Sequence, residues 1–511
     1  MKLTAMLRAS ADRAPGAEAL VAGARRWTYA QLVADVDRAA GALAQLGIGQ
    51  GDRVAVMTFN EPEFILAAFG AWELGAVLVP VNHKMKPPEV AYTVGHCGAA
   101  LGIASPELLP TVRAGAPEIE WLGTSGAEGF AERLAVAPPF GEAHADDAAP
   151  AEILYTSGTT SAPKGCVLSH RALTQLAVLL SLNLDARRDE RMLVAMPIWH
   201  SAPINVCVLP TLFMGGTVVL QREYHPVETF ELIAAERITT FFGPTVAFLA
   251  PFRALAGSGR EVADFDFSTM RRWLFGGAPI DAAAVERIVQ TYRPGGHYQL
   301  FGMTETGPSG AVLLPHEQQV KPGSIGAAAM LGARMRVVDA DGHDIRPGQT
   351  GEVWFLTDTV MDGYLDNPEA TAAAFEGPWY RTGDIARMDD DGFYYIVDRL
   401  KDVIIVGGEN VFSLEVEEAI ATHPRVADVA VVGRPDPEWG QQLVAHITTS
   451  EGADLTVDEL QDYLAPRLAR YKIPRQVVMS AELPRNPSGK LLKHQLRAEA
   501  ASEPADSASG G

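Results

Sequence analysis

The chain has 511 residues, 47% of them apolar, and its 42 basic and 63 acidic side chains give a formal net charge of −21. This length allows about three folding units of roughly 150 residues each. The acidic excess disfavours nucleic acid and anionic membranes as main partners, because both attract basic surfaces.

The N-terminal hundred residues alternate helix and strand signals. Residues 1–15 carry charges within their apolar stretch, so they predict a first helix rather than a secretory signal. Thr28 can cap a helix that ends near Gly47, and apolar strands at 54–57 and 76–81 flank a helical stretch at 62–74. This alternation is typical of a doubly wound α/β unit.

The middle of the chain contains a loop-like stretch and a long uncharged segment. Residues 123–150 lack periodicity and predict a surface excursion, after which a second α/β region covers 152–315. Residues 192–221 contain no Asp, Glu, Lys or Arg. Prolines and glycines interrupt this segment too often for a membrane span, so we expect buried strands and a short helix around a pocket.

The last third predicts a small β-rich subdomain at 326–395 and then a compact α+β segment. A helix of that segment begins at Thr456, with Glu459 completing a capping box. Residues 499–511 are small and polar, which predicts disorder. The expected domains are a large α/β domain with a β-rich subdomain (1–398), a small α+β domain (399–498) and a disordered tail (499–511).

The cysteine pattern bears on the cellular compartment. Cys97, Cys166 and Cys207 lie far apart and form no CxxC pair. Neither a disulfide framework nor a thiolate zinc site is expected, and a reducing cytoplasm suits this usage.

The strongest local motif is at residues 155–165, which read YTSGTTSAPKG. Five Ser or Thr hydroxyls, two glycines and Lys164 can surround a polyphosphate with backbone N–H groups and one cation. Pro163 and Gly165 flank the lysine, so the motif is not a Walker loop. The alternative is an ordinary hydroxyl-rich turn.

Further segments match one family in order: GGAP at 276–279, QLFGMTE at 299–305, YRTGD at 380–384, DRLKD at 398–402 with GGEN at 407–410, and PRNPSGK at 484–490. With the 155–165 motif, they resemble the adenylate-forming superfamily, which includes acyl-CoA synthetases, aryl-CoA ligases and adenylation domains. The resemblance implies an α/β fold with a small mobile C-terminal domain, and it implies ATP, Mg²⁺ and CoA as cofactor and co-substrates.

The resemblance also implies roles for single residues. ATP or AMP binding falls to Thr156, Ser157, Gly158, Thr159, Thr160, Lys164, Gly276, Gly277, Ala278, Phe301, Gly302, Thr304, Asp384 and Arg399. Within this set Phe301 would stack on adenine, while Asp384 and Arg399 would bind the ribose. Glu305 would hold Mg²⁺, and Lys490 would reach the carboxylate and the α-phosphate as a catalytic residue beside Thr304, Glu305 and His200.

The acyl pocket is expected to involve Trp199, His200, Asn205, Leu300 and Met303, with His200 as a gate. Amino-acid-activating relatives usually carry an Asp after this motif, and residues 192–221 have no acid. An unpaired buried ammonium would be costly, so a neutral aliphatic or aromatic acid is expected. Two departures from the family pattern are Ser161 in the phosphate loop and Leu300, where relatives commonly carry Gly.

The C-terminal domain is expected to rotate about a hinge at Lys401, with Gly407 and Gly408 lining a tunnel for the CoA arm. Arg470, Lys472 and Arg475 are candidates for the nucleotide end of CoA, or else form a solvated basic turn.

The predicted activity is a cytoplasmic carboxylate–CoA ligase that forms an acyl adenylate. The alternative is an adenylating enzyme that passes the acyl group to a carrier-protein thiol or another small nucleophile. A third reading is a binding protein that has lost the chemistry, which the retained Glu305, Asp384 and Lys490 disfavour. The expected partners are small molecules, with no nucleic acid or membrane span, and the protein is expected to be a monomer or homodimer.

Overall fold

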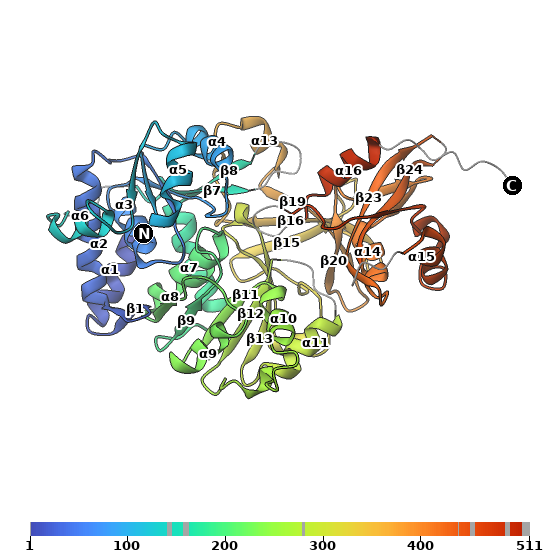
Figure 1. Cartoon of the computed structure of the whole chain (residues 1–511), viewed down its shortest axis with the longest axis horizontal. Helices are drawn as coiled ribbons and strands as arrows, with labels where there is room; N and C mark the ends of the chain where they lie inside the picture. The colour runs from blue at the N-terminus through green and yellow to red at the C-terminus, as the bar shows by residue number, and fades with distance from the viewer. Residues whose placement is uncertain are drawn as a thin grey trace.

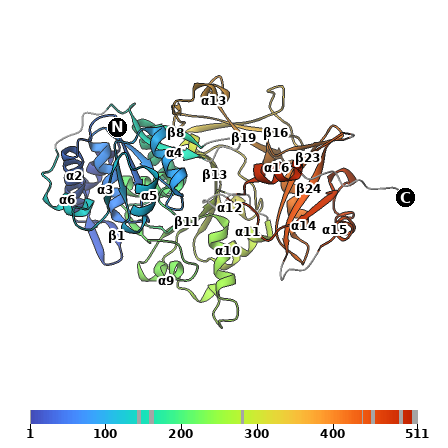
Figure 2. The ribbon, with the colours of Figure 1, turned by 45° about the horizontal axis from the view of Figure 1, so that its top comes forward.

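The computed structural model describes residues 2–140, 146–156, 163–277, 282–437, 439–449, 455–485 and 491–502. Figure 1 shows the chain running from an α/β region at the N-terminus to a smaller region at the C-terminus, with β15, β16 and β19 between them. Figure 2 gives the same arrangement from a tilted view.

The first sheet contains seven strands in the order β17-β8-β7-β4-β3-β5-β6. Its strands are β3 (Arg53–Met57), β4 (Val77–Pro80), β5 (Leu101–Ala104), β6 (Glu120–Gly123), β7 (Pro150–Thr156), β8 (Lys164–Ser169) and β17 (Gly363–Tyr364). The accompanying helices are α3 (Pro62–Glu73), α4 (Pro87–Cys97), α5 (Leu109–Gly115) and α6 (Phe130–Val136), with the 3-10 turn η1 (Pro106–Leu108). Strands β3 to β7 are parallel, whereas β8 and β17 are antiparallel additions.

The second sheet contains eight strands in the order β14-β13-β12-β11-β9-β10-β1-β2. Its strands are β1 (Glu18–Ala22), β2 (Arg25–Thr28), β9 (Arg191–Val194), β10 (Thr217–Leu220), β11 (Thr240–Gly243), β12 (Arg272–Gly276), β13 (Gly296–Gly302) and β14 (Gly310–Leu313). Its helices are α1 (Leu3–Arg13), α2 (Tyr29–Gln45), α7 (His170–Asn183), α8 (Leu209–Met214), α9 (Glu228–Ala235), α10 (Thr245–Ala254), α11 (Ala282–Thr291) and α12 (Pro315–Gln318). Short turns are the π-helix η2 (Ala202–Val208) and the 3-10 turns η3 (Val262–Asp264) and η4 (Thr304–Thr306).

The β-rich subdomain is a five-stranded sheet in which β20 pairs with β19. Its strands are β15 (Ala333–Val338), β16 (Thr350–Thr357), β18 (Phe375–Glu376), β19 (Trp379–Met388) and β20 (Tyr394–Arg399), and the helix α13 (Pro368–Ala373) precedes β18. Gly342, between β15 and β16, and Gly392, between β19 and β20, have positive φ, which glycine adopts without a Cβ clash.

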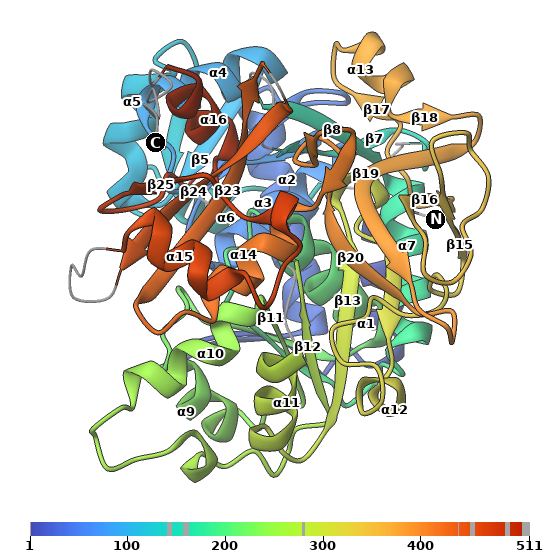
Figure 3. The same cartoon turned by 90° about the vertical axis from the view of Figure 1, so that its right-hand side faces the viewer.

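The C-terminal region is a second five-stranded sheet with three helices, seen in front in Figure 3. Its strands are β21 (Ile404–Val406), β22 (Glu409–Val411), β23 (Val426–Asp436), β24 (Gly440–Thr449) and β25 (Gln476–Met479). Its helices are α14 (Ser413–Ala421), α15 (Val457–Leu464) and α16 (Lys493–Ser502), with the turn η6 (Arg470–Lys472).

The structure confirms most of the predicted elements and corrects two. The predicted caps form, since Thr28 and Thr456 each complete a capping box. The excursion at 123–150 contains helix α6, whose Phe130 and Leu134 are buried. Helix α16 continues past Glu499 to Ser502, and Ala500 is buried against Leu483, so the predicted tail begins too early.

One apolar core joins the two large sheets, with members from α1, α2, α3 and α7 as well as from the strands. Between residues 2 and 502, within the described ranges, no helix combines the length and apolar composition needed to cross a bilayer.

Candidate active site

Glu305 lies at the centre of the candidate site, on the turn η4 that follows β13. Its Oε1 atom accepts a hydrogen bond from the Tyr364 hydroxyl at 3.1 Å and lies 3.5 Å from the Thr156 hydroxyl oxygen. The backbone carbonyl of Glu305 also accepts from the N–H of Met361 at 2.8 Å. Three segments far apart in the sequence, the end of β7, the turn η4 and β17, thus meet at one carboxylate.

Strand β17 brings Tyr364 beside the base of the predicted phosphate loop. In the antiparallel pairing with β8, Tyr364 stands opposite Cys166, and the Lys164 Nζ atom lies 4.9 Å from the centre of the Tyr364 ring. This is a cation–π contact with the ring whose hydroxyl donates to Glu305. Burial raises the pKa of the Tyr364 phenol, so the phenol stays a hydrogen-bond donor to Glu305.

The donor set around Glu305 suits a hard divalent cation. One carboxylate and the hydroxyls of Thr156 and Tyr364 offer oxygen atoms, which Mg²⁺ prefers. The residues present therefore fit a magnesium site.

The predicted ribose residues form an ion pair with each other. Asp384 on β19 and Arg399 at the end of β20 are register partners, and Arg399 Nε lies 2.7 Å from Asp384 Oδ1. Asp384 is buried, whereas 40% of the Arg399 side chain is exposed. The guanidinium thus supplies the charge partner that a buried carboxylate needs.

Gly276 and Gly277, which are predicted to bind ATP or AMP, lie at the carboxyl end of β12, and Phe301, which is predicted to stack on adenine, lies near the end of β13. Gly276 is the register partner of Leu300, and a Cβ at position 276 would stand 2.2 Å from the Leu300 carbonyl oxygen. Gly277 has a φ of +83°. Both positions thus require glycine, the first for space and the second for its backbone angle. Phe301 packs toward Phe355, with ring centroids 6.0 Å apart.

The predicted gate segment, residues 197–200, lies between β9 and η2. Trp199 and His200 stack with ring centroids 3.8 Å apart, and Ser201 Oγ lies 3.1 Å from Thr304 Oγ1. Burial is the main cause that lowers the pKa of His200 to about 4, so its imidazole is neutral at pH 7. Leu300 and Met303 are partly buried against the shared core.

Asn205, predicted for the acyl pocket, is hydrogen-bonded to a buried carboxyl. It is fully buried in η2, and its amide Nδ2 donates to Glu152 Oε2 at 2.9 Å. Glu152, on β7, is also fully buried, and burial raises the pKa of its carboxyl to about 7. One oxygen of each side chain, Glu152 Oε1 and Asn205 Oδ1, has no hydrogen-bond partner among the described residues. The pocket role of Asn205 stays a prediction.

The hinge segment is anchored on both sides. Asp398 accepts hydrogen bonds from the N–H and the hydroxyl of Ser413 at the start of α14. On α16, Arg497 donates to the Lys401 carbonyl at 2.9 Å and pairs with Asp402 at 2.9 Å.

The predicted CoA glycines form the tight turn between β21 and β22. Gly407 and Gly408 have φ values of +61° and +89°, and the Gly407 N–H donates to the Trp439 carbonyl at 2.7 Å. The Arg475 guanidinium lies 5.2 Å from the Trp439 ring, whereas Lys472 is held by Glu415 at 2.7 Å. Of the basic candidates, Arg475 is therefore near the turn, and Lys472 has a carboxylate partner.

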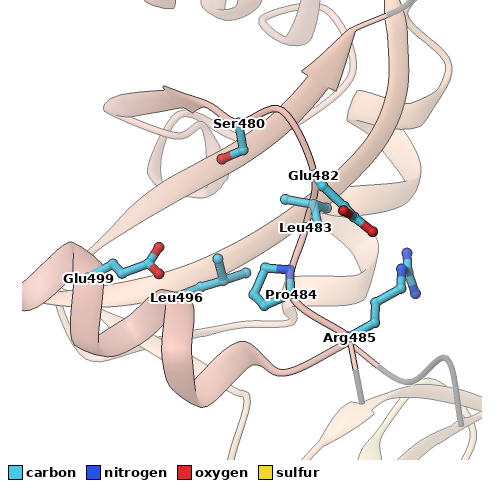
Figure 4. Close-up of a pocket in the computed structure, with 7 residues that line it drawn as sticks. All are labelled: Ser480, Glu482, Leu483, Pro484, Arg485, Leu496 and Glu499. Atoms are coloured by element: carbon cyan, nitrogen blue, oxygen red, sulfur yellow. The ribbon is translucent and has the colours of Figure 1, made fainter. Parts of the chain in front are cut away.

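A hollow of about 390 Å³ lies in the C-terminal region (Figure 4). Leu483 and Leu496 line it together with Glu482, Arg485 and Glu499. It contains none of the predicted site residues. Arg485, which lines this hollow, forms a β-bridge with Leu491.

Several predicted site residues lie outside the described residues. These are Ser157, Gly158, Thr159 and Thr160 of the phosphate loop, Ser161 beside them, Ala278, and Lys490. Their roles stay predictions.

Two family patterns match the chain. The AMP-binding enzyme pattern covers residues 7–365, and the AMP-binding enzyme C-terminal domain covers residues 415–490. The chain belongs to the AMP-binding enzyme family. Both patterns fit the division between the large α/β body and the C-terminal sheet.

This AMP-binding enzyme is similar to characterised ligases over almost its whole length. It is 36% identical over 498 residues to a feruloyl-CoA synthase of Amycolatopsis sp, covering 95% of this chain and 96% of the relative. It is 36% identical over 511 residues to the long-chain-fatty-acid–CoA ligase FadD13 of Mycobacterium tuberculosis, covering 96% and 97%. It is 35% identical over 498 residues to the fatty acid–[acyl-carrier-protein] ligase ScoC of Streptomyces coeruleorubidus, covering 95% and 94%.

Solved structures of the o-succinylbenzoate CoA synthetase MenE from Bacillus subtilis have the same fold. The complex with the acyl-adenylate intermediate OSB-AMP superposes with a TM-score of 0.86 at 28% identity, covering 96% of this chain and 97% of MenE. A complex with ATP and a magnesium ion gives the same TM-score and identity, covering 96% and 98%. The predictions of the family, the fold and the enzyme class are therefore confirmed.

Sequence reasoning missed three side chains of this AMP-binding enzyme. Tyr364 sits in a two-residue strand, which leaves no periodic signal. Glu152 lies in an apolar strand, where a single acid could have flagged a buried partner. His83 follows the predicted strand 76–81, and polar residues at the carboxyl end of a parallel strand are a known signal for a site.

Proposed function

We propose that the chain is an ATP-dependent carboxylate–CoA ligase that acts through an acyl adenylate on a neutral aliphatic or aromatic acid. The observation that carries the proposal is the convergence on Glu305. The hydroxyls of Thr156 and Tyr364 lie at its carboxylate, and Lys164 lies over the Tyr364 ring.

The first half-reaction joins two anions, the carboxylate and the α-phosphate of ATP. Side chains must hold the reacting atoms in line and offset their charge. In our proposal Thr304 donates its hydroxyl to the phosphate, and Asp384 accepts the ribose hydroxyls while Arg399 donates to the same sugar. Bound Mg²⁺, held by Glu305, would neutralise phosphate charge. Lys490 would stabilise charge between the carboxylate and the α-phosphate.

The second half-reaction passes the acyl group to a thiol. The CoA sulfur attacks the acyl carbon, the bond to the phosphate oxygen breaks, and AMP leaves. The turn at Gly407 and Gly408 would admit the CoA arm, with Arg475 near its entrance.

The neutral acid is supported by the charges around η2. The Asn205 side chain of η2 donates a hydrogen bond to the buried carboxyl of Glu152. Burial raises the pKa of this carboxyl to about 7, so at pH 7 it carries less negative charge than an exposed glutamate. It is already hydrogen-bonded to Asn205, and residues 192–221 contain no acid that could pair with a substrate ammonium. The feruloyl and fatty-acid relatives, whose acids carry no ammonium, agree with this choice.

The alternative function differs only in the nucleophile that accepts the acyl group. ScoC is a ligase for an acyl-carrier protein, so a carrier-protein thiol is the second candidate. We favour CoA because two of the three relatives named above are CoA ligases.

We also propose that the domains divide at residues 398 and 399, and that the enzyme works in the cytoplasm as a monomer or homodimer. The three cysteines are buried and free, which suits a reducing compartment.

The test is a panel of neutral aliphatic, aromatic and amino acids read by pyrophosphate release. Each acid is assayed without an acceptor, with CoA and with a phosphopantetheinylated carrier protein. We expect neutral acids to release pyrophosphate and CoA to yield a thioester. Amino acids outperforming all neutral acids would contradict the substrate class, and thioester formed on the carrier alone would favour the alternative. An inactive wild-type enzyme across the panel would contradict the proposal itself.

A further inference from the structure

The indole of Trp199 is held from the opposite sheet. Its Nε1–H donates to His83 Nδ1 at 3.2 Å, and the two rings lie edge to face with centroids 6.3 Å apart. Trp199 is 9% exposed and carries the stacked His200 on its other side. A buried indole N–H needs an acceptor, and His83 is the one that the described contacts provide.

His83 itself is held in place by its neighbours. It follows β4, where the Asn82 side chain accepts from the Lys84 N–H at 2.9 Å and the Asn82 carbonyl accepts from the Met85 N–H at 3.0 Å. The Phe59 ring also lies 4.9 Å from the His83 ring. The imidazole therefore contacts two aromatic side chains, Phe59 and Trp199.

The backbone before Trp199 is fixed from the same sheet. Asn60, which is buried, donates its amide to the carbonyls of Met196 at 3.0 Å and Gln221 at 2.9 Å. Its oxygen accepts from the Ile198 N–H at 2.8 Å. These hydrogen bonds fix the backbone of the gate segment. The orientation of the Trp199 ring then depends on the partners of its side chain.

We propose that His83 is a positioning residue for the acid-binding gate, holding the Trp199 ring so that His200 stacks in the orientation that receives the acid. This inference deepens the proposed function and rests on it. Burial lowers the pKa of His83 to about 4, with Lys84 and Arg222 as further causes, so the imidazole is neutral at pH 7 and its Nδ1 lone pair can accept. His83 acts through Trp199 and not on the reacting atoms.

The pairing is specific to tryptophan, because phenylalanine has no N–H to satisfy. A double-mutant cycle with His83→Leu and Trp199→Phe therefore isolates the hydrogen bond. The readout is pyrophosphate exchange with the best acid of the panel, giving separate KM values for acid and ATP. His83→Gln is the rescue variant, since its amide oxygen can accept from the indole. His297→Leu is the matched control, since His297 is another buried histidine whose pKa burial lowers to about 4.

We expect His83→Leu to raise the KM for the acid roughly tenfold, the size of one lost buried hydrogen bond, while the KM for ATP changes less than twofold. In the Trp199→Phe background the same change should alter the KM for the acid less than twofold. His83→Gln should restore it to within about threefold of wild type, and folded His297→Leu should leave it unchanged.

Equal effects of His83→Leu in both backgrounds, or no effect in either, would overturn the inference. If His83→Leu does not fold, His83→Phe takes its place in the cycle with the same expected outcomes. A wild-type enzyme that exchanges no pyrophosphate with any acid is a different result, since it refutes the proposed function before the cycle begins.

Discussion

Replacing Glu305 by glutamine separates its charge from its structural contacts. Glutamine keeps the side-chain length and one acceptor oxygen, so it can still accept from the Tyr364 hydroxyl at the 3.1 Å position and face Thr156. The fold around η4 should therefore persist. What disappears is the negative charge that would hold Mg²⁺.

The magnitude follows from the number of contacts removed. Losing one preorganised electrostatic contact to the transition state typically costs about 10²–10³ in rate. We expect Glu305→Gln to reduce adenylate formation by about that factor and to raise the Mg²⁺ concentration that gives half the maximal rate. Tyr364→Phe removes a single hydrogen bond to the carboxylate and should reduce the rate about tenfold.

ATP–pyrophosphate exchange at a series of Mg²⁺ concentrations measures both effects. Thioester formation from supplied acyl adenylate is the control, because phosphoryl charge is no longer being built in that step. If Glu305→Gln keeps the wild-type rate and the wild-type Mg²⁺ dependence, Glu305 is not the metal ligand.

Three further substitutions test other parts of the site. Lys490→Ala should lower adenylate formation about 10²–10³-fold while sparing thioester formation from supplied acyl adenylate, and equal losses in both half-reactions would argue against its role. Leu300→Gly should shift preference toward longer or bulkier acids in a competition assay, because it opens volume beside Gly276; an unchanged ranking would show that Leu300 is not on the pocket wall. Lys401→Pro should retain pyrophosphate exchange and lose most thioester formation, and wild-type rates in both steps would exclude Lys401 as the pivot.

Local sequence patterns predicted the elements and the motifs of this protein. Helix α2 was readable because Thr28 offers a cap and the following apolar residues recur at helical spacing. The pair Asp384 and Arg399 was identified by its motifs, and the antiparallel pairing of β19 and β20 places the two side chains together. In both cases the information lies within one segment or between adjacent strands.

Contacts between distant segments were not predictable in the same way. Tyr364 reaches Glu305 because a two-residue strand pairs with β8. Trp199 contacts His83 because the chain after β9 lies beside the chain after β4, a strand of the other large sheet. The partner of Asn205, Glu152, lies 53 positions earlier in the sequence. Side-chain pairing across such distances depends on tertiary packing, which periodicity does not encode.

The contacts at the hinge narrow the place where a rotation can occur. Arg399 pairs with Asp384, and the Leu400 N–H donates to the Gly383 carbonyl at 2.8 Å, so the backbone up to Leu400 is tied to β19. From Lys401 onward, Arg497 holds the chain to α16 through the Lys401 carbonyl and Asp402. The N–H groups of Asp402 and Val403 also donate to the Arg399 carbonyl, at 2.8 and 3.1 Å, so the predicted pivot lies within a hydrogen-bonded turn that spans residues 399–403.

A rotation of the C-terminal domain about Lys401 would have to break hydrogen bonds that cross the pivot. Asp398 lies before the pivot, yet it accepts from the N–H and hydroxyl of Ser413 at the start of α14, beyond the pivot. Lys493 of α16 donates to the Ser413 hydroxyl at 2.7 Å and pairs with Glu417 at 2.7 Å, so α14 and α16 form one unit. A rotation about Lys401 would carry this unit away from Asp398 and leave its buried carboxylate without the two donors of Ser413, with the Arg399 N–H still donating at 2.7 Å. Because burial already raises the pKa of Asp398, that loss would favour its protonated form or its exposure to water. The Asp398–Ser413 contact therefore stabilises the present orientation of the C-terminal domain, and a second orientation requires a compensating contact made elsewhere.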